Sequence, residues 1–210
     1  MIRTAIFDFD GVLSFDCFYQ SALSPEQSDI AHWIAKNIFE KDRELVRKWM
    51  RGQISSLQIN EKIAEGTGAD LNLLNQTLTK SVELMKLDED LLMFIVEIRR
   101  QGIKVGLVTD NMDVFSDITV SNHRLDQKFD VVLNSADYGF LKKEQNGKLL
   151  DIALEKLGEK DISKSLFADN QQEIIELYKQ KGGRGYVYKS FKKFEKWAHE
   201  NLKLEPVPQF

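Results

Sequence analysis

The chain has 210 residues, of which 42% are hydrophobic and 30% are charged, and its formal net charge is −4. This length suits one domain with a large insertion or two small domains, and the composition is that of ordinary globular proteins. No basic stripe with interleaved aromatic residues occurs, which argues against a nucleic-acid partner, and no apolar run reaches the length of a membrane span.

The chain begins with a short apolar run that ends in two carboxylates. Thr4-Ala5-Ile6-Phe7 has the pattern of a buried strand, and Asp8-Phe9-Asp10-Gly11-Val12 follows it directly. Residues two apart on an extended chain point the same way, so Asp8 and Asp10 can face one ligand. A divalent cation together with a phosphoryl group would offset their mutual repulsion. The pentapeptide alone fits an ordinary strand that ends in a solvated Asp-Gly turn equally well.

From Glu26 to about Lys86 the pattern is helical throughout. Ser55, followed three residues later by Gln58, is a capping-box pattern that opens one helix, and Gly66-Thr67-Gly68 closes it. A further helix is expected over roughly Leu71 to Leu84. We therefore expect residues 16–87 to form an all-helical cap, inserted after the first strand.

After Asp88 the pattern alternates between helix and strand. The strands are expected at 103–108, 130–133, 165–168 and 186–188, and the helices at 89–100, 114–123, 146–157, 171–181 and 191–202. Strands separated by helices of this length form right-handed βαβ units. The sequence predicts an α/β fold: a Rossmann-like three-layer core with a parallel sheet, residues 1–15 and 88–210, plus the inserted cap.

Polar residues stand at the predicted carboxyl ends of these strands, where open parallel α/β sheets bind ligands. Asp8 and Asp10 are joined there by Thr109-Asp110-Asn111 and Asp169-Asn170, and the pair Lys142-Lys143 follows the strand that begins at Asp130. We expect them to converge on one site. Acids, a hydroxyl, an amide and a lysine together match the needs of phosphoryl transfer.

These segments resemble the haloacid dehalogenase (HAD) superfamily, and specifically its phosphatase branch with an inserted helical cap of the C1 type. The resemblance covers the whole core through four motifs in the family's order: Asp8 to Val12, Leu107 to Asn111, Gly139 to Lys142, and Leu166 to Asn170. Haloacid dehalogenases lack an acid at the position of Asp10, because a halide leaves without a proton. Asp10 therefore favours phosphate chemistry.

The resemblance implies a role for each acid. Asp8 would be the nucleophile that forms an aspartyl-phosphate intermediate. Asp10 would protonate the leaving oxygen and then deprotonate the hydrolytic water. The implied cofactor is Mg²⁺, held by the metal ligands Asp8, Asp10 (through its backbone carbonyl) and Asp169.

The same resemblance implies that the remaining motif residues bind the phosphoryl group. Thr109 would hydrogen-bond to it, with help from the backbone of Asp110 and Asn111. Lys142 would neutralise the paired charges of nucleophile and phosphate. Counting from Gly139 selects Lys142 as the motif lysine, whereas counting back from the following helix falls nearer Lys143; we assign Lys142.

Two positions depart from the family pattern. Asn170 stands where many relatives carry a second aspartate, and Glu173, one helical turn on, is an alternative source of that charge. Lys143 stands where a proline is usual.

Among the aromatic residues of the cap, Trp49 is the better candidate for a substrate wall, that is, for a side chain that lines the substrate pocket. Packing in the core is the commoner role for such a residue. Arg47 or Arg51 is a candidate for holding an anionic part of the substrate, against the commoner role of a surface arginine. Cys17, the single cysteine, is expected to be a small buried thiol in the hinge.

The expected function is a Mg²⁺-dependent phosphatase that acts on a small phosphorylated metabolite, because an inserted cap shields the site from large substrates. One alternative is a phosphomutase of the same family, and another is a non-catalytic metabolite-binding or regulatory protein that keeps the fold. A lone cysteine fits a reducing compartment, and Met1-Ile2-Arg3 leads into a strand and not into a signal peptide. We expect a cytoplasmic protein with no membrane partner, and a monomer as the default.

Overall fold

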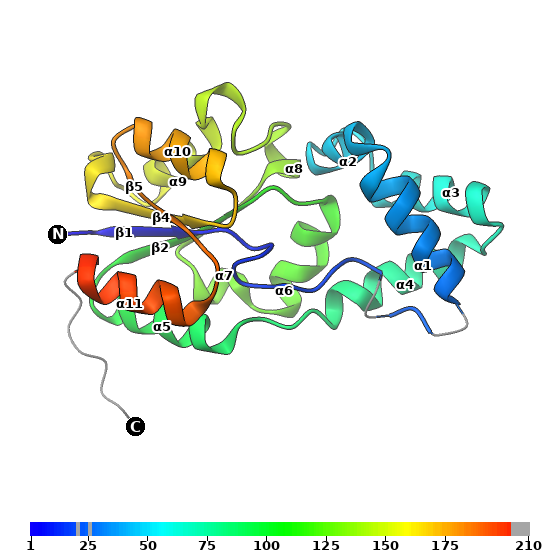
Figure 1. Ribbon diagram of the computed structural model, residues 1–210, viewed down its shortest axis with the longest axis horizontal. Helices are drawn as coiled ribbons and strands as arrows, with labels where there is room; N and C mark the ends of the chain where they lie inside the picture. Colours follow the sequence, from blue (N-terminus) through cyan, green and yellow to red (C-terminus); the bar gives the residue numbers. More distant parts are fainter. Residues whose placement is uncertain (20–21, 25–26, 203–210) are drawn as a thin grey trace.

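A computed structural model describes residues 1–19, 22–24 and 27–202, the side chain of Leu202 excepted. Its centre is one parallel five-stranded sheet in the order β3-β2-β1-β4-β5 (Figure 1). The strands are β1 (Thr4–Phe7), β2 (Lys104–Thr109), β3 (Val131–Asn134), β4 (Ser165–Asp169) and β5 (Arg184–Val187). The predicted α/β Rossmann-like fold is confirmed, and β1 lies in the middle of the sheet between β2 and β4.

Helices cover both faces of this sheet. On one face lie α9 (Lys148–Lys156) and α10 (Gln172–Gln180), and on the other lie α5 (Glu89–Arg100) and α11 (Phe191–Leu202) (Figure 1). The alternation of side chains along β1 fills both layers: Ile6 belongs to the cluster under α9 and α10, whereas Ala5 and Phe7 belong to the cluster with α5 and α11. Burial on both faces explains the uninterrupted apolar run that marks this strand in the sequence.

Most predicted bounds agree with the structure within two residues. The segment expected at 114–123 is helical, with a π-helix, η3 (Phe115–Thr119), continued by α6 (Val120–Asn122). The structure adds the short helices α7 (Leu125–Lys128) and α8 (Ser135–Tyr138) and the 3₁₀ turns η4 (Glu144–Asn146) and η5 (Ile162–Lys164). Single turns of this length carry no hydrophobic period, so the sequence pattern does not reveal them.

The residues between β1 and α5 form helices beyond the carboxyl ends of the strands (Figure 1). They are α1 (Ser28–Ile34), the π-helix η2 (Ala35–Glu40), α2 (Arg43–Met50), α3 (Ser56–Thr67) and α4 (Leu71–Glu83). The predicted capping box is present at the start of α3, and Gly68 ends that helix in the left-handed conformation. We call residues 16–87 the insertion.

The two chain segments that join the insertion to the core run side by side. Ser14 forms an isolated β-bridge with Leu87, and the N–H of Asp88 donates to the carbonyl of Leu13 at 2.8 Å. Next to them, the N–H of Lys86 donates to the Asp16 carboxylate at 2.7 Å. The insertion therefore leaves and re-enters the core at one place.

A second contact between insertion and core surrounds the turn from α2 to α3. The carboxylate of Asp113, in the core, accepts hydrogen bonds from the Trp49 indole N–H at 2.9 Å, from the Ser56 N–H at 2.8 Å and from the Ser56 hydroxyl. Gly52 has a φ of +64°, and a Cβ there would fall 2.4 Å from the carbonyl oxygen of Ala136. Glycine is the residue that permits both the conformation and the close approach.

No helix in residues 1–19, 22–24 and 27–202 combines the length and the apolar character needed to cross a membrane.

Candidate active site

Three adjacent strands bring the predicted site residues together. Asp8 directly follows β1, Thr109 ends β2 and Asp169 ends β4, and all three side chains are buried. The N–H of Asp8 donates to the carbonyl of Ala168 at 3.0 Å, and its carboxylate accepts from the Phe9 N–H at 2.8 Å. These bonds fix the Asp8 carboxylate at the centre of the sheet's carboxyl edge.

Lys142 reaches this centre from the loop after α8. Its Nζ lies 2.7 Å from a carboxylate oxygen of Asp8 and 2.7 Å from one of Asp169, and the side chain is fully buried. Lys143 instead lies at the surface, where its Nζ is 2.7 Å from the exposed carboxylate of Glu173. The structure thus places Lys142 in the site, and it places Lys143 and Glu173 outside it.

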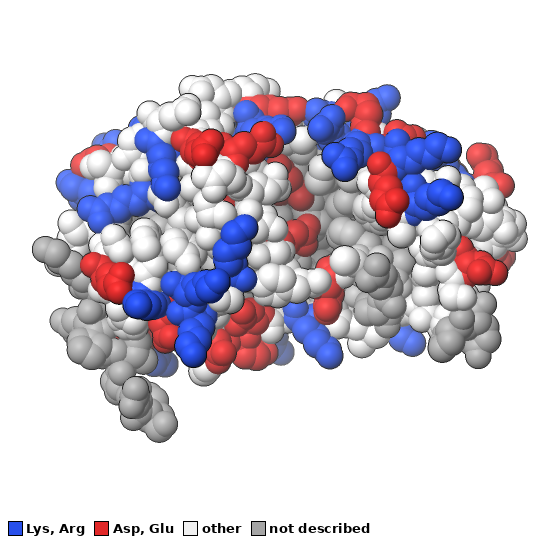
Figure 2. All heavy atoms as spheres, in the orientation of Figure 1, with Lys and Arg blue, Asp and Glu red and all other residues white. Residues whose placement is uncertain are grey.

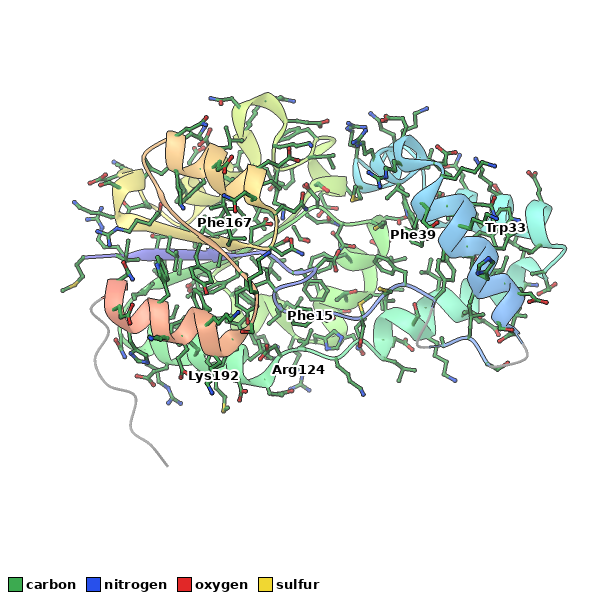
Figure 3. The ribbon with its side chains drawn as sticks, in the orientation of Figure 1. Phe15, Trp33, Phe39, Arg124, Phe167 and Lys192 are labelled. Carbon is green, nitrogen blue, oxygen red and sulfur yellow. The ribbon has the colours of Figure 1, made fainter. Side chains whose placement is uncertain are left out.

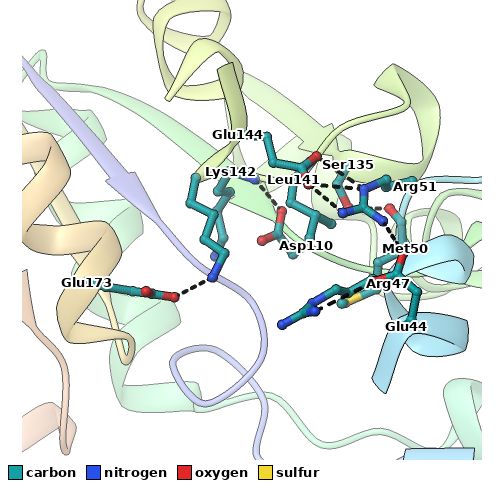
Figure 4. A network of polar contacts seen from close by, with 11 residues as sticks. Glu44, Arg47, Met50, Arg51, Asp110, Ser135, Leu141, Lys142, Glu144 and Glu173 are labelled. Atoms are coloured by element: carbon teal, nitrogen blue, oxygen red, sulfur yellow. Dashed lines mark hydrogen bonds and ion pairs between the residues drawn. The ribbon is translucent and has the colours of Figure 1, made fainter. Parts of the chain in front are cut away.

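The loop that carries Lys142 is held by acids on both sides (Figure 4). The Lys142 N–H donates to the Asp110 carboxylate at 2.7 Å, and the Leu141 N–H donates to Glu144 at 2.9 Å. Glu144 also pairs with Arg51 of the insertion. The position of the insertion is therefore linked, through Glu144, to the loop that positions the buried lysine.

Asp10 faces the cavity between core and insertion. Its carboxylate accepts a hydrogen bond from the side-chain amide of Asn111 at 3.2 Å. The next residue, Gly11, has a φ of +74°, and a Cβ there would fall 2.0 Å from the amide nitrogen of Asn170. Only glycine fits this turn, which directs Asp10 toward the cavity and packs Asn170 against the loop.

Negative charge exceeds positive charge at this site. Four carboxylates, those of Asp8, Asp10, Asp110 and Asp169, surround the single ammonium of Lys142. Figure 2 shows acidic side chains along the hollow between core and insertion. Asp8 and Asp169 are buried and Asp10 and Asp110 are partly buried, so this surplus of negative charge attracts a cation, and carboxylate and carbonyl oxygens are the ligands that Mg²⁺ prefers.

The pKa values of these groups are shifted by burial and by the charges beside them. Burial raises the pKa of Asp8 well above its usual range, against the opposing charge of Lys142. Burial raises the pKa of Asp10 to about 6, again opposed by Lys142 and assisted by Asp110. Burial alone would lower the pKa of Lys142, but Asp8, Asp169 and Asp110 raise it above its usual value, so the lysine is charged.

The predicted magnesium ligands are two side chains, Asp8 and Asp169, and one backbone carbonyl, that of Asp10. In the described part of the chain no group of three or more His, Cys, Asp or Glu side chains has an arrangement suited to a metal ion. The predicted set is compatible with that finding because its third ligand is a backbone oxygen. Together with the surplus of buried carboxylate charge, the donor set fits a hard divalent cation.

The hydroxyl of Thr109 is buried and has no hydrogen-bond partner among the described residues. An unpaired buried hydroxyl costs stability unless a ligand satisfies it. It stands at the end of β2, beside the strand that carries Asp8. A phosphoryl oxygen near Asp8 would supply the missing partner.

The expectation that the backbone of Asp110 and Asn111 helps to bind phosphate stays a prediction, and the structure shows what Asn111 contacts. The N–H of Asn111 donates to the Ser135 hydroxyl at 3.1 Å, and its side chain holds Asp10. Ser135, which the sequence reasoning missed, also donates to the carbonyl of Met50 in the insertion at 2.6 Å. The sequence feature that points to Ser135 is its position directly after β3, at the same carboxyl edge of the sheet.

The raised pKa of Asp10 predicts a pH effect on the metal-free protein. The folded state binds this proton more tightly than the unfolded chain, whose ordinary value is 3.8. The stabilisation of the folded state by this proton is therefore fully present below about pH 4. It is lost as the pH rises through about 6, which lowers the free energy of unfolding by up to about 3 kcal/mol. Urea unfolding in a chelator should show that Asp10→Asn is more stable than the wild type at pH 7.5 and loses this advantage near pH 4. An equal difference at both values would contradict the assignment.

No protein-family model matches the sequence, and no curated protein matches it. Solved structures do match. A HAD family enzyme from Bacteroides thetaiotaomicron, solved as an aspartate-to-alanine mutant in complex with magnesium and inorganic phosphate, has a TM-score of 0.70 at 16% identity, over 96% of this chain and 100% of that chain. A predicted HAD-like family hydrolase from Porphyromonas gingivalis has a TM-score of 0.70 at 19% identity, over 98% of this chain and 100% of that chain.

An L-2-haloacid dehalogenase from Xanthobacter autotrophicus has a TM-score of 0.63 at 16% identity, over 96% of this chain and 84% of that chain. The chain has the HAD fold. The resemblance carried by the four HAD motifs is thereby confirmed at the level of the fold. At 16% identity, the substrate of a matched protein says nothing about the substrate of this chain. The matched structures include both a dehalogenase and a HAD family enzyme solved with phosphate. The choice between these chemistries has to come from the site itself.

Proposed function

We propose that this protein is a Mg²⁺-dependent phosphatase that hydrolyses a small phosphorylated metabolite through an aspartyl-phosphate at Asp8. One observation carries the proposal: the carboxyl of Asp10 lines the cavity, stands two residues after the buried Asp8 and accepts a hydrogen bond from the side-chain amide of Asn111. A carboxyl in this position can give a proton to a leaving oxygen and then take one from water. Displacement of a halide requires no such group, whereas departure of an alkoxide does.

In this proposal Asp8, the backbone carbonyl of Asp10 and Asp169 would hold Mg²⁺. When bound, the ion supplies positive charge that keeps the Asp8 carboxylate ionised and offsets the charge of the phosphate. Lys142, 2.7 Å from both Asp8 and Asp169, adds a permanent positive charge at the same place.

Two displacements at phosphorus complete the reaction. First, an oxygen of the Asp8 carboxylate attacks phosphorus, the ester P–O bond breaks, and protonated Asp10 gives its proton to the leaving oxygen. Second, Asp10, now a carboxylate, takes a proton from water as the water attacks the same phosphorus. The P–O bond to Asp8 breaks, phosphate is released, and both acids return to their starting states. The Thr109 hydroxyl donates to a phosphoryl oxygen throughout.

The insertion would act as a cap in this scheme, with residues 1–15 and 88–210 as the catalytic core. Its helices lie over the carboxyl edge of the sheet, and its contacts through Asp113 and Glu144 hold it there. Such a cover excludes bulk water from the acyl-phosphate and limits the substrate to a small molecule.

The proposal is tested by release of phosphate from phenyl phosphate in Mg²⁺ and in chelator. Turnover is expected only with the metal. Absence of turnover with phenyl phosphate and with a panel of small phosphate esters, in Mg²⁺, would overturn the proposal.

The role of Asp10 predicts a dependence on the leaving group. Asp10→Asn should lower kcat/KM for phenyl phosphate, which covers formation of the aspartyl-phosphate and not its hydrolysis, by about 10²–10⁴-fold, because phenoxide needs a proton to leave. The loss should be much smaller for 2,4-dinitrophenyl phosphate, whose anion leaves unprotonated. If the two esters lost rate equally, Asp10 would not be the acid.

A further inference from the structure

A cavity of about 510 Å³ lies between the core site and the insertion. Asp10, Gly11, Met112 and Asn170 form its core side. The remaining lining residues come from the insertion and from the segment that leads into it. If Asp10 protonates the leaving oxygen, as proposed above, this cavity holds the alcohol part of the phosphate ester.

Four aromatic side chains are among the lining residues, and we call them the aromatic wall. Phe15, Phe18, Tyr19 and Phe39 all line the cavity. Figure 3 shows Phe15 on the segment between core and insertion, and Phe39 on the insertion. Phe15 is 60% exposed, so its ring is accessible to a molecule in the cavity.

This aromatic wall has a rigid support. The rings of Phe18 and Phe39 pack on Trp49, with ring centroids 6.0 Å and 6.4 Å from it. Trp49 is fully buried, and Asp113 fixes its N–H. Trp49 therefore has the packing role, which the sequence analysis gives as the commoner one, and not that of a substrate wall; it lies behind the aromatic wall and supports it.

The charges that line the cavity are all acidic. Asp10, Asp16 and Glu40 contribute carboxylates, and no lysine or arginine is among the described lining residues. The insertion's positions outside the described ranges, 20, 21, 25 and 26, are Gln, Ser, Pro and Glu in the sequence, so none of them is basic. Cys17 also lines the cavity and is exposed, contrary to the buried thiol expected from the sequence.

The two arginines considered for an anionic substrate are paired with acids. Arg51 contacts Glu144 and Glu44, and Arg47 lies 3.6 Å from Glu44 (Figure 4). Neither lines the cavity. A second phosphate or a carboxylate on the substrate would therefore meet carboxylates there and no free cation, which also disfavours a phosphomutase that must hold a bisphosphate.

We propose that the substrate is a phosphate monoester whose alcohol part has an apolar body and no second anionic group, and that the cavity favours a cationic, ammonium-type substituent on that body over an anionic one. The faces of aromatic rings attract ammonium groups, and Glu40 and Asp16 add negative charge to the same wall. This inference rests on the proposed phosphatase function and specifies its substrate class.

The test compares three esters of nearly equal size: benzyl phosphate, 4-carboxybenzyl phosphate and 4-(aminomethyl)benzyl phosphate. We expect kcat/KM to be highest for the cationic or the neutral ester, and at least about tenfold lower for the carboxylate than for the ammonium ester. Calorimetric binding of the matching phosphonates, which are not hydrolysed, should give the same order. Equal values for the three esters, or a preference for the carboxylate, would overturn the substrate class while leaving the phosphatase intact.

Two substitutions of lining residues, with one control outside the cavity, test whether the cavity sets the preference among these esters. Glu40→Gln should reduce the ratio of kcat/KM between the ammonium and the neutral ester, whereas Asp29→Asn, an exposed acid on the neighbouring α1 outside the cavity, should leave that ratio unchanged. Phe15→Ala should raise KM for benzyl phosphate, because its exposed ring lines the cavity and contributes little to the folded core. Unchanged ratios in Glu40→Gln together with an unchanged KM in Phe15→Ala would contradict the assignment. If no ester is turned over at all, the proposed function and this inference both fall.

Discussion

Replacement of Asp8 by asparagine is expected to abolish release of phosphate, with a loss of kcat of about 10³-fold or more. The amide keeps the size of the carboxyl and still offers an oxygen to the Phe9 N–H, but it is a very poor nucleophile. The measurement is hydrolysis of phenyl phosphate in Mg²⁺ under saturating substrate.

Thermal unfolding of the same variant separates chemistry from folding. Because burial disfavours the ionised Asp8 in the metal-free protein, Asp8→Asn should be at least as stable as the wild type in chelator. A variant that folds normally and retains more than a few per cent of the activity would rule out Asp8 as the nucleophile.

Replacement of Lys142 by methionine should cost both activity and stability. The methionine keeps much of the length of the side chain but leaves the carboxylates of Asp8 and Asp169 buried beside each other without their common partner. Removal of one partner from a buried ion pair typically costs about 3–5 kcal/mol. Urea unfolding in chelator should show a loss of this order, and kcat in Mg²⁺ should fall by at least about 10²-fold.

The adjacent lysine supplies a matched control. Lys143→Met removes an exposed pair with Glu173, which is worth less than about 1 kcal/mol, and should leave kcat nearly unchanged. The opposite result, with Lys143→Met inactive and Lys142→Met active, would show that the lysine of the site has been wrongly assigned.

The sequence predicted that the strand-end side chains lie close together because one geometric rule governs their positions. Asp8, Thr109 and Asp169 each stand at the carboxyl end of a buried strand, and parallel strands carry their carboxyl ends to one edge. The rule needs only the strand ends and not the order of the strands. Ser135 stands at an equivalent position after β3, so the same rule would have found it.

The choice between Lys142 and Lys143 is where sequence reasoning reached its limit. The two residues are adjacent, and counting from the glycine or from the following helix gave different answers. The structure explains the conflict: the left-handed residues Gln145, Asn146 and Gly147 separate the lysine loop from α9, so the helix begins later than its pattern suggests. The bond from the Lys142 N–H to Asp110 then sets which lysine enters the site.

The cavity was beyond prediction for a different reason. Phe15 and Phe18 come from the segment that leads into the insertion, whereas Phe39 comes from η2, and the orientation of the insertion on the core brings them to one cavity. That orientation depends on long-range contacts, Trp49 and Ser56 with Asp113 and Arg51 with Glu144, which have no local signature. Periodicity correctly predicted the helices of the insertion, but it carries no information on which face meets the active site.

The central claim is that this HAD fold performs phosphate and not halide chemistry. The most direct test uses two samples of the wild-type protein in Mg²⁺, one with phenyl phosphate and the other with 2-chloropropionate. Released phosphate is measured in the first sample and released chloride in the second. We predict release of phosphate that disappears in chelator and in Asp8→Asn, and no release of chloride. Release of chloride without release of phosphate would contradict the claim and would identify a dehalogenase.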